Sequence, residues 1–587
     1  PPGCVYYSVA YLNFTPTRMD PMDFVDGKPV HSRAYRWRRF LNWFPLGLTY
    51  AFLYMGRYNL TVSKNALGEL MTKADFGAIF GAGTLTYAFA FLINGPLTDR
   101  IGGKRAMLVG SAGAALMNVA MGVLTWLLLT GGLQFNMVLW FSLLYAANMY
   151  FQSFGAVAIV KTNSNWFHIR ERGTFGGIFG ILISLGLYFA FDWGQLIVNA
   201  TVANPKELSL VQRGLRSLLA VDGASGIDQT WWVFFIPAIL LGLFFIIDLF
   251  VLREKPSGAG FGDFNTGDAT SGDADKKYST KEIIIKVLTN PILITIAFIE
   301  FCSGVMRNGI MHWYLIFTAD MGYPKDFFIN AHWGLLLMIA GVLGGIFAGF
   351  ISDKVFGSRR GPVAALLYGI LLASTLAMWP FVTSTHNSVK GGMQLVIQPK
   401  QIARYAEQTP LTLEGIKQKV AEKFTIEKSD AYTWKISPKE SASLTASKIA
   451  DITLANYERF NKYKNKSEAM HVQVKDIGVV RGAGADSRAY ILGFIVVLMS
   501  LAVIGVHGML SGTSTMDFGG TKGAATAVGL IDGFVYLGTG VQSLSLGFLT
   551  SQNWSWWPPF LVPFAVIGLF LAIKIWHAFP DAKRKAH

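Results

Sequence analysis

Arginine stands at two places inside apolar stretches that are long enough to cross a membrane. Arg57 lies in "YAFLYMGRYN" (50–59) and Arg307 lies in "VMRNGIMHWY" (305–314). A charge in the hydrocarbon core costs at least about 2.5 kcal/mol, so an ionisable residue there is a functional-site hypothesis by default. A guanidinium donates two parallel hydrogen bonds to phosphate or carboxylate, which lysine cannot do. The pair therefore predicts a site for a small anion, namely a phosphate ester, inorganic phosphate or a carboxylate.

Four further side chains are candidates for the same anion site. Tyr54 and Asn59 flank Arg57 on its helix, His312 follows Arg307, and Lys161 ends the fourth apolar stretch. Lysine near a helix end also reaches for the membrane surface, and histidine also packs between helices. Both interpretations stay open for Lys161 and His312.

Three acids lie in apolar stretches, and we assign them to charge coupling: Glu300, Asp192 and Asp532. Such acids neutralise surplus positive charge, titrate during transport or bind a cation. Glu300 precedes Arg307 by seven residues and shares its helix face. The alternative to an anion site is therefore a structural arginine that is neutralised by an internal acid.

The elements that carry these residues are membrane helices. Of the 587 residues, 52% are hydrophobic and only 15% are charged, which excludes a soluble protein. A spanning helix needs about 20 mostly apolar residues. We predict an all-α integral membrane protein with twelve transmembrane helices in two pseudo-symmetric six-helix bundles, plus a small extracytoplasmic α+β insertion. The expected spans are 42–66, 76–98, 105–130, 138–162, 174–199, 231–252, 291–318, 332–354, 362–384, 488–511, 522–549 and 557–577.

Lysine and arginine gather at every second connection between these spans. Cytoplasmic loops carry this excess, so both termini and the middle linker are expected in the cytoplasm. The net charge of +15 then reflects topology and contact with anionic membrane lipid, and no nucleic-acid partner is expected. A bacterial inner (cytoplasmic) membrane is the expected location.

A repeated motif supports the division into two halves. "GPLTDRIGGKR" (95–105) follows the second span, and "GFISDKVFGSRR" (349–360) follows the eighth. The glycines allow close helix approach, and the acids accept hydrogen bonds from a neighbouring helix N-terminus or pair with a cation. We predict a breakable gating motif that consists of Gly95, Asp99, Arg100, Gly349, Asp353 and Lys354.

The remaining segments complete the expected organisation. The linker is rich in Gly, Ser and Asp and is typical of a flexible tether. In the insertion, "MQLVIQ", "AYTWKIS" and "HVQVKDI" resemble strands, whereas 412–424 and 439–464 resemble amphipathic helices. Met19 and Met22 are candidate start residues. The predicted divisions are 1–40 (cytoplasmic segment), 41–252 (first bundle), 253–290 (linker), 291–384 (helices seven to nine), 385–487 (insertion), 488–578 (helices ten to twelve) and 579–587 (basic tail).

Five stretches resemble the major facilitator superfamily, and within it the organophosphate:inorganic phosphate antiporters of glycerol-3-phosphate and hexose-phosphate transport. They are "YAFLYMGRYN", "WFHIRERG", "VMRNGIMHW", "GFISDKVFGSRRG" and "KGAATAVGLIDGFVYLG". The resemblance implies that Arg57 and Arg307 hold the substrate phosphoryl group, and that the halves rock to exchange an organophosphate for phosphate. Two departures weaken the implied cradle: Phe91 replaces a lysine that members often have, and "TFGGIFGILISLG" lacks the histidine that some use.

We therefore expect a secondary antiporter in which Arg57 and Arg307 clamp a phosphoryl group at the interface of the repeats. One alternative is a proton-coupled symporter of an organic carboxylate. Another is a transporter-like receptor, or a subunit of a larger membrane complex, that contacts a protein partner through 385–487. No nucleophile, base or metal-ligand constellation stands out, so we expect neither an enzyme nor a cofactor.

Overall fold

The computed structural model describes most of the chain between residues 23 and 578. Outside the description lie 26–27, 132–135, 168–171, 204, 206–207, 222–225, 264–280, 283–284, 286–287, 322, 324–326, 357–358, 389–392, 398–423, 431–432, 439–471 and 477–486. The helices of the first half are α1 (Arg33–Leu67), α2 (Lys73–Ile101), α3 (Gly103–Thr130), α4 (Met137–Ser164), α5 (Arg172–Tyr188), α6 (Gly194–Thr201), α7 (Leu210–Leu218) and α8 (Trp232–Val251). Those of the second half are α10 (Pro291–Met311), α11 (Trp313–Asp320), α12 (Phe328–Ala331), α13 (Trp333–Lys354), α14 (Arg360–Ser388), α18 (Ser487–His507), α19 (Thr515–Gln552) and α20 (Trp557–Lys574).

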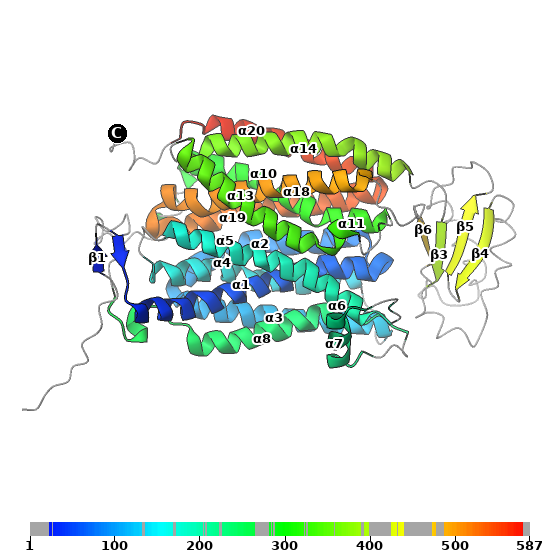
Figure 1. Cartoon of the computed structure of the whole chain (residues 1–587), viewed down its shortest axis with the longest axis horizontal. Coiled ribbons are helices and arrows are strands. Elements are labelled where there is room, and N and C mark those ends of the chain that lie inside the picture. Colours follow the sequence, from blue (N-terminus) through cyan, green and yellow to red (C-terminus); the bar gives the residue numbers. More distant parts are fainter. Residues whose placement is uncertain are drawn as a thin grey trace, which may run out of the picture.

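The long helices lie side by side along one direction (Figure 1). The strands β3–β6 lie beyond one end of this helical body, and β1 (Asp23–Val25) lies at the other. We call these the sheet end and the terminal end. We call 33–251 the N-terminal half and 291–574 the C-terminal half. Segments of both halves run between the same two ends. The repeated sequence motif likewise indicates two equivalent halves.

Ten helical segments in the described part of the chain are long and apolar enough to cross a membrane. Two further long helices, α1 and α19, also run through the body, with 35 and 38 residues. Large apolar side chains such as Phe89, Phe250, Phe494 and Phe570 are exposed on the outside, as contact with lipid tails requires. The protein is therefore an integral membrane protein, and the exact count of twelve spans stays a prediction.

Regular helix is interrupted at several places, two of which, at 189–193 and at His312, lie inside spans that the sequence predicts as continuous helices. π-helical turns replace regular helix at η3 (Phe189–Trp193) and η6 (Gly508–Ser514). The seventh span breaks at His312, between α10 and α11. Interruptions of this kind concentrate at functional sites because they redirect side chains and free backbone groups. Apolar periodicity does not reveal them.

The two halves meet mainly where α2 packs along α19 and where α5 packs on α13. The first contact is close because glycine removes the side chains from it. A Cβ atom on Gly77 would lie 2.6 Å from the carbonyl oxygen of Ser543 and 2.7 Å from Cα of Gly547. Small residues of this kind let membrane helices approach and slide.

A four-stranded antiparallel sheet lies within 385–487, with strand order β4-β5-β3-β6. Its strands are β3 (Met393–Ile397), β4 (Phe424–Asp430), β5 (Thr433–Pro438) and β6 (Val472–Asp476). Three of them coincide with the strands predicted from the sequence, and β4 is additional. The predicted helix at 439–464 lies outside the described residues, as does 412–423 of the other helix.

At the terminal end, Glu254 holds the N-terminus of α3. Its two carboxylate oxygens accept hydrogen bonds from the backbone N–H groups of Gly103 (2.9 Å) and Lys104 (2.8 Å). The sequence motif predicts this kind of role for Asp99 and Asp353, whose side chains lie outside the description. The neighbouring Arg100 and Lys354 are exposed. An acid from the start of the linker therefore caps α3, the helix that begins at the end of the motif.

Candidate functional site

Arg57 is fully buried, and neutral groups surround it. Its Nη1 donates to the hydroxyl of Tyr536 at 3.0 Å, and its Nη2 donates to Tyr87 Oη at 2.8 Å and to Gln152 Oε1 at 3.3 Å. Its Nε atom has no hydrogen-bond partner among the described residues. The ring of Tyr54 lies 4.6 Å from Cζ, in cation–π contact. Residues from α1, α2, α4 and α19 thus hold one guanidinium in place.

Arg307 is almost as deeply buried, with 6% of its surface exposed, but it has fewer partners. Its Nε and Nη2 atoms are buried and find no hydrogen-bond acceptor in the part of the chain that the structure describes. These two atoms form the edge of a guanidinium that binds a phosphate or carboxylate bidentately. Its Cζ lies 5.9 Å from the centre of the Tyr536 ring, and Arg57 Cζ lies at the same distance. Both arginines therefore approach one tyrosine, from opposite halves of the chain.

Neither guanidinium has an ion-pair partner among the described residues. The ion pairs in that part of the chain are Lys73–Asp320 and His507–Glu300. An uncompensated buried charge is costly, and a buried donor without an acceptor adds to this cost. Two such cations around one tyrosine therefore form a site whose chemistry fits an anion.

Two of the predicted binding residues lie at or near this site. Tyr54 contacts Arg57 directly. His312 lies one turn nearer the sheet end, where its ring centre is 4.7 Å from that of Tyr58. Its Nδ1 lies 2.7 Å from Thr61 Oγ1, and its Nε2 makes no hydrogen bond within the described part of the chain.

Two others are not brought to the arginines. Asn59 donates to Asn118 Oδ1 at 2.8 Å and to the carbonyl of Val233 at 3.2 Å, so it ties α1 to α3 and α8. Lys161 lies in the last turn of α4. Nine residues separate it from Gln152, which is about 13 Å along a helix. Residue spacing in the sequence did not reveal that the side chains of Asn59 and Lys161 lie away from the arginines.

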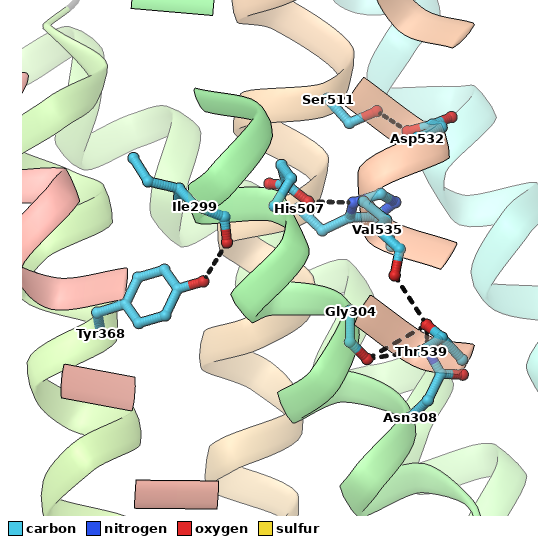
Figure 2. Close-up of polar contacts among 10 residues, drawn as sticks. Ile299, Gly304, Asn308, Tyr368, His507, Ser511, Asp532, Val535 and Thr539 are labelled. Carbon is cyan, nitrogen blue, oxygen red and sulfur yellow. Dashed lines mark hydrogen bonds and ion pairs between the residues drawn. The ribbon is translucent and has the colours of Figure 1, made fainter. Parts of the chain in front are cut away.

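The predicted acids occupy three different settings. Glu300 Oε2 lies 2.8 Å from His507 Nδ1 and not against Arg307. The prediction that Glu300 neutralises Arg307 is therefore wrong. Ser511 donates to Asp532 Oδ1 (Figure 2). Asp192 accepts hydrogen bonds from the backbone N–H groups of Gly334 and Leu335, at 2.6 and 3.1 Å, and so caps α13 of the other half.

Polar contacts also join the two halves on the sheet side of the arginines. Lys73 Nζ lies 2.7 Å from Asp320 Oδ2, and Trp554 Nε1 donates to the same oxygen at 3.1 Å. Asn65 Nδ2 donates to the carbonyl of Leu315 at 3.4 Å. Together with Asp192 and with the Thr61–His312 contact, these bonds form what we call the sheet-end latch.

Sequence reasoning missed several residues of the site. Tyr536 lies one turn beyond Asp532 in a glycine-rich stretch, and Tyr87 lies one turn before Phe91. A polar aromatic residue in each of two apolar spans was the available signal. Phe91, at the position of the missing lysine, contacts both rings, with centroid distances of 4.5 Å to Tyr87 and 6.0 Å to Tyr536. Aromatic side chains therefore occupy the position at which a lysine would have supplied a third cation.

Comparisons with known proteins agree with this architecture. The family model described as Major Facilitator Superfamily matches residues 46–393. The glycerol-3-phosphate transporter of Bacillus subtilis is 26% identical over 59% of this chain and 72% of its own length. A probable hexose phosphate transport protein of Chlamydia trachomatis is 25% identical over 59% of this chain and 71% of its own length.

Two other matches extend the picture. The membrane sensor protein UhpC of Salmonella typhimurium is 25% identical over 61% of this chain and 74% of its own length. The solved structure of a bacterial homologue of the human lysosomal transporter Spinster superposes with a TM-score of 0.56. That match covers 93% of this chain and 98% of the other at 14% identity, so it supports the fold alone.

Proposed function

Because the chain belongs to the Major Facilitator Superfamily, we propose that it is a secondary active transporter that exchanges a phosphorylated organic anion for inorganic phosphate. Relatives named as glycerol-3-phosphate and hexose phosphate transporters support this substrate class. The observation that carries the proposal is the pair of buried guanidiniums, Arg57 and Arg307, which lie around Tyr536 and form no ion pair with any described residue. A phosphoryl group offers the oxygens and the negative charge that this pair lacks.

The bound phosphoryl group takes the free edge of Arg307, formed by Nε and Nη2. It also competes with the Tyr536 hydroxyl for Arg57 Nη1, which donates to that hydroxyl in the described structure. This hydrogen bond crosses from α1 to α19. Binding therefore replaces a contact between the halves by a contact through the substrate. An anion that pulls on both arginines stabilises states in which the halves approach, which is how a ligand biases a conformational equilibrium.

The access state of the described structure follows from the sheet-end latch. If the sheet faces the extracytoplasmic side and the termini face the cytoplasm, the latch closes the outer side. Exchange then requires that the latch opens once the substrate is bound. We place the protein in a bacterial inner membrane with its terminal end toward the cytoplasm, the orientation that the basic segments near that end favour.

The Lys73–Asp320 pair tests this opening step. Replacing Asp320 by Lys puts two ammonium groups side by side and removes the acceptor of Trp554, so the closed latch is destabilised. Each exchange cycle must also close the latch again, so a less populated closed state slows the cycle, and we expect the exchange rate to fall about fivefold, the upper range for a partly exposed pair. The exchanged pair Lys73→Asp/Asp320→Lys restores the attraction, and with it most of the rate. A swapped variant that is as slow as the single variant would contradict the latch.

Labelled inorganic phosphate in proteoliposomes tests the function itself. Vesicles that contain the full chain and are loaded with unlabelled phosphate are expected to take up label much faster than vesicles loaded with chloride. External glycerol 3-phosphate or a hexose phosphate should compete, and a sugar acid should not. Strong competition by the sugar acid, together with uptake that needs a proton gradient, would instead favour carboxylate symport.

A second candidate function is a receptor or complex subunit. The relative named as a membrane sensor protein and the four-stranded sheet within 385–487 favour it. A stable protein partner that co-purifies with the full chain, and is lost on deleting 385–487 while the helical body still folds, would support this function. Exchange activity without such a partner supports transport.

A further inference from the structure

Three ionisable side chains gather in the C-terminal half away from the arginines: Glu300 on α10, His507 at the end of α18 and Asp532 on α19. His507 Nδ1 lies 2.8 Å from Glu300 Oε2, and Ser511 donates to Asp532 (Figure 2). The three side chains approach one another from three helices. We call them the acid–histidine cluster.

The members of the cluster differ in their access to solvent. The side chain of Glu300 is fully buried, whereas that of His507 is 21% exposed. The second oxygen of Glu300, Oε1, is buried and has no hydrogen-bond partner among the residues that the structure covers. A carboxylate that leaves one oxygen unpaired in a buried site has room for a proton there, and the more accessible imidazole provides the route by which it arrives.

The local backbone also sets this place apart. α18 ends at His507, and the following π-helical segment η6 carries Ser511, the hydroxyl that binds Asp532. The irregular segment thus presents a histidine and a hydroxyl to two acids on other helices. A regular α-helix would put residues 507 and 511 one turn apart on the same face with its backbone groups paired.

The cluster is connected to the anion site through two helices. Arg307 follows Glu300 on α10 by seven residues, about 10 Å along the axis, and Tyr536 follows Asp532 on α19 by one turn. When two unit charges lie 10 Å apart inside a protein, the presence of one changes the binding constant of the other about tenfold. An anion on Arg307 therefore favours a proton on the cluster, and the reverse.

Among the described residues, the other titratable groups near the cluster are tyrosine and cysteine side chains or are already named. Tyr368 on α14 donates to the carbonyl of Ile299 at 2.6 Å, next to Glu300. Cys302 lies two residues beyond Glu300 on α10, and Tyr50 on α1 is close enough to Asp532 for an electrostatic interaction. The helices α13 and α20 carry titratable residues only in their last turns.

We propose that the acid–histidine cluster is a proton-binding site that couples proton uptake to anion binding during transport. The inference rests on the proposed anion transport and adds a second, separate site to it. One proton binds to Glu300, His507 or Asp532 as the anion reaches Arg307. It leaves when the anion leaves, so no other bond forms or breaks.

The test compares the wild type with Glu300→Gln and His507→Gln. The control is Asp248→Asn, because Asp248 is also a buried acid with a hydroxyl donor, Thr49 at 2.7 Å, but lies in the N-terminal half. Proton uptake is measured with a pH dye in weakly buffered detergent solution when inorganic phosphate is added. Phosphate exchange is measured in proteoliposomes between about pH 5 and pH 8, the range in which histidine titrates.

We expect that wild type and Asp248→Asn take up a proton with each bound anion, and that their apparent affinity for phosphate changes about tenfold more across this range than that of Glu300→Gln. The titration of phosphate itself is common to all variants and cancels in this comparison. Glu300→Gln and His507→Gln should lose the proton uptake. If Glu300→Gln does not fold, His507→Gln decides. Equal proton uptake in the folded variants and in wild type would overturn the inference, whereas absence of exchange in the wild type would overturn the transport proposal.

Discussion

Arg307→Lys reduces phosphate exchange at least tenfold and leaves the thermal stability of the empty protein unchanged. In the described structure Nε and Nη2 of Arg307 make no hydrogen bond, so a lysine gives up none of those contacts when no anion is bound. With an anion bound, the lysine cannot form the bidentate pair, and a lost charge-assisted hydrogen bond costs about 1.5–3 kcal/mol. The measurement is the exchange rate in proteoliposomes beside the unfolding temperature in detergent.

Arg57→Lys is expected to behave differently, and the contrast sharpens the test. Arg57 makes hydrogen bonds to Tyr536, Tyr87 and Gln152 in the empty protein, so its replacement lowers both exchange and stability. Arg213→Lys, on the exposed surface of α7, is the control and should change neither. Full exchange in Arg307→Lys would assign that arginine a structural role.

Some of this site could be predicted from the sequence. A guanidinium in an apolar span is conspicuous because its cost demands a partner, so Arg57 and Arg307 were found without coordinates. Strands such as Met393–Ile397 were also found, since alternating apolar residues flanked by turns are a local signal. Membrane spans follow from length and hydropathy alone.

The partners of the charged residues could not be predicted. Glu300 has Arg307 on its own helix face at a favourable spacing, yet its carboxylate binds His507, which is distant in the sequence. Helix spacing ranks neighbours within one helix, but tertiary packing decides which neighbouring helix comes closest. Tyr536 is similar: its position between two arginines exists only once α19 packs against α2 and α10. The π-helical turns that carry Asp192 and Ser511 leave no trace in hydropathy.

The second large effect is expected at Asp192, an acid of the N-terminal half that caps α13 of the C-terminal half. Its carboxylate accepts two backbone N–H groups, those of Gly334 and Leu335, at the positive end of the helix dipole. Asp192→Ala leaves both donors without this acceptor. At about 1.5–3 kcal/mol for a hydrogen bond to a charged group, the closed state of the sheet-end latch should become about ten to a hundred times less favoured.

Two measurements separate an opened latch from a merely frayed helix. Amide hydrogen exchange at Gly334 and Leu335 should accelerate by about tenfold or more, which local fraying alone would also produce. In an Asn65→Cys background, a membrane-impermeant maleimide added from the sheet side should also react faster, because residue 65 lies between the halves and contacts Leu315. The control is Asp228→Ala, which removes a carboxylate that accepts from Ala203 N–H within one half. Faster amide exchange without faster labelling would restrict Asp192 to a local cap, whereas acceleration of both, absent in the control, makes it a bond that opening must break.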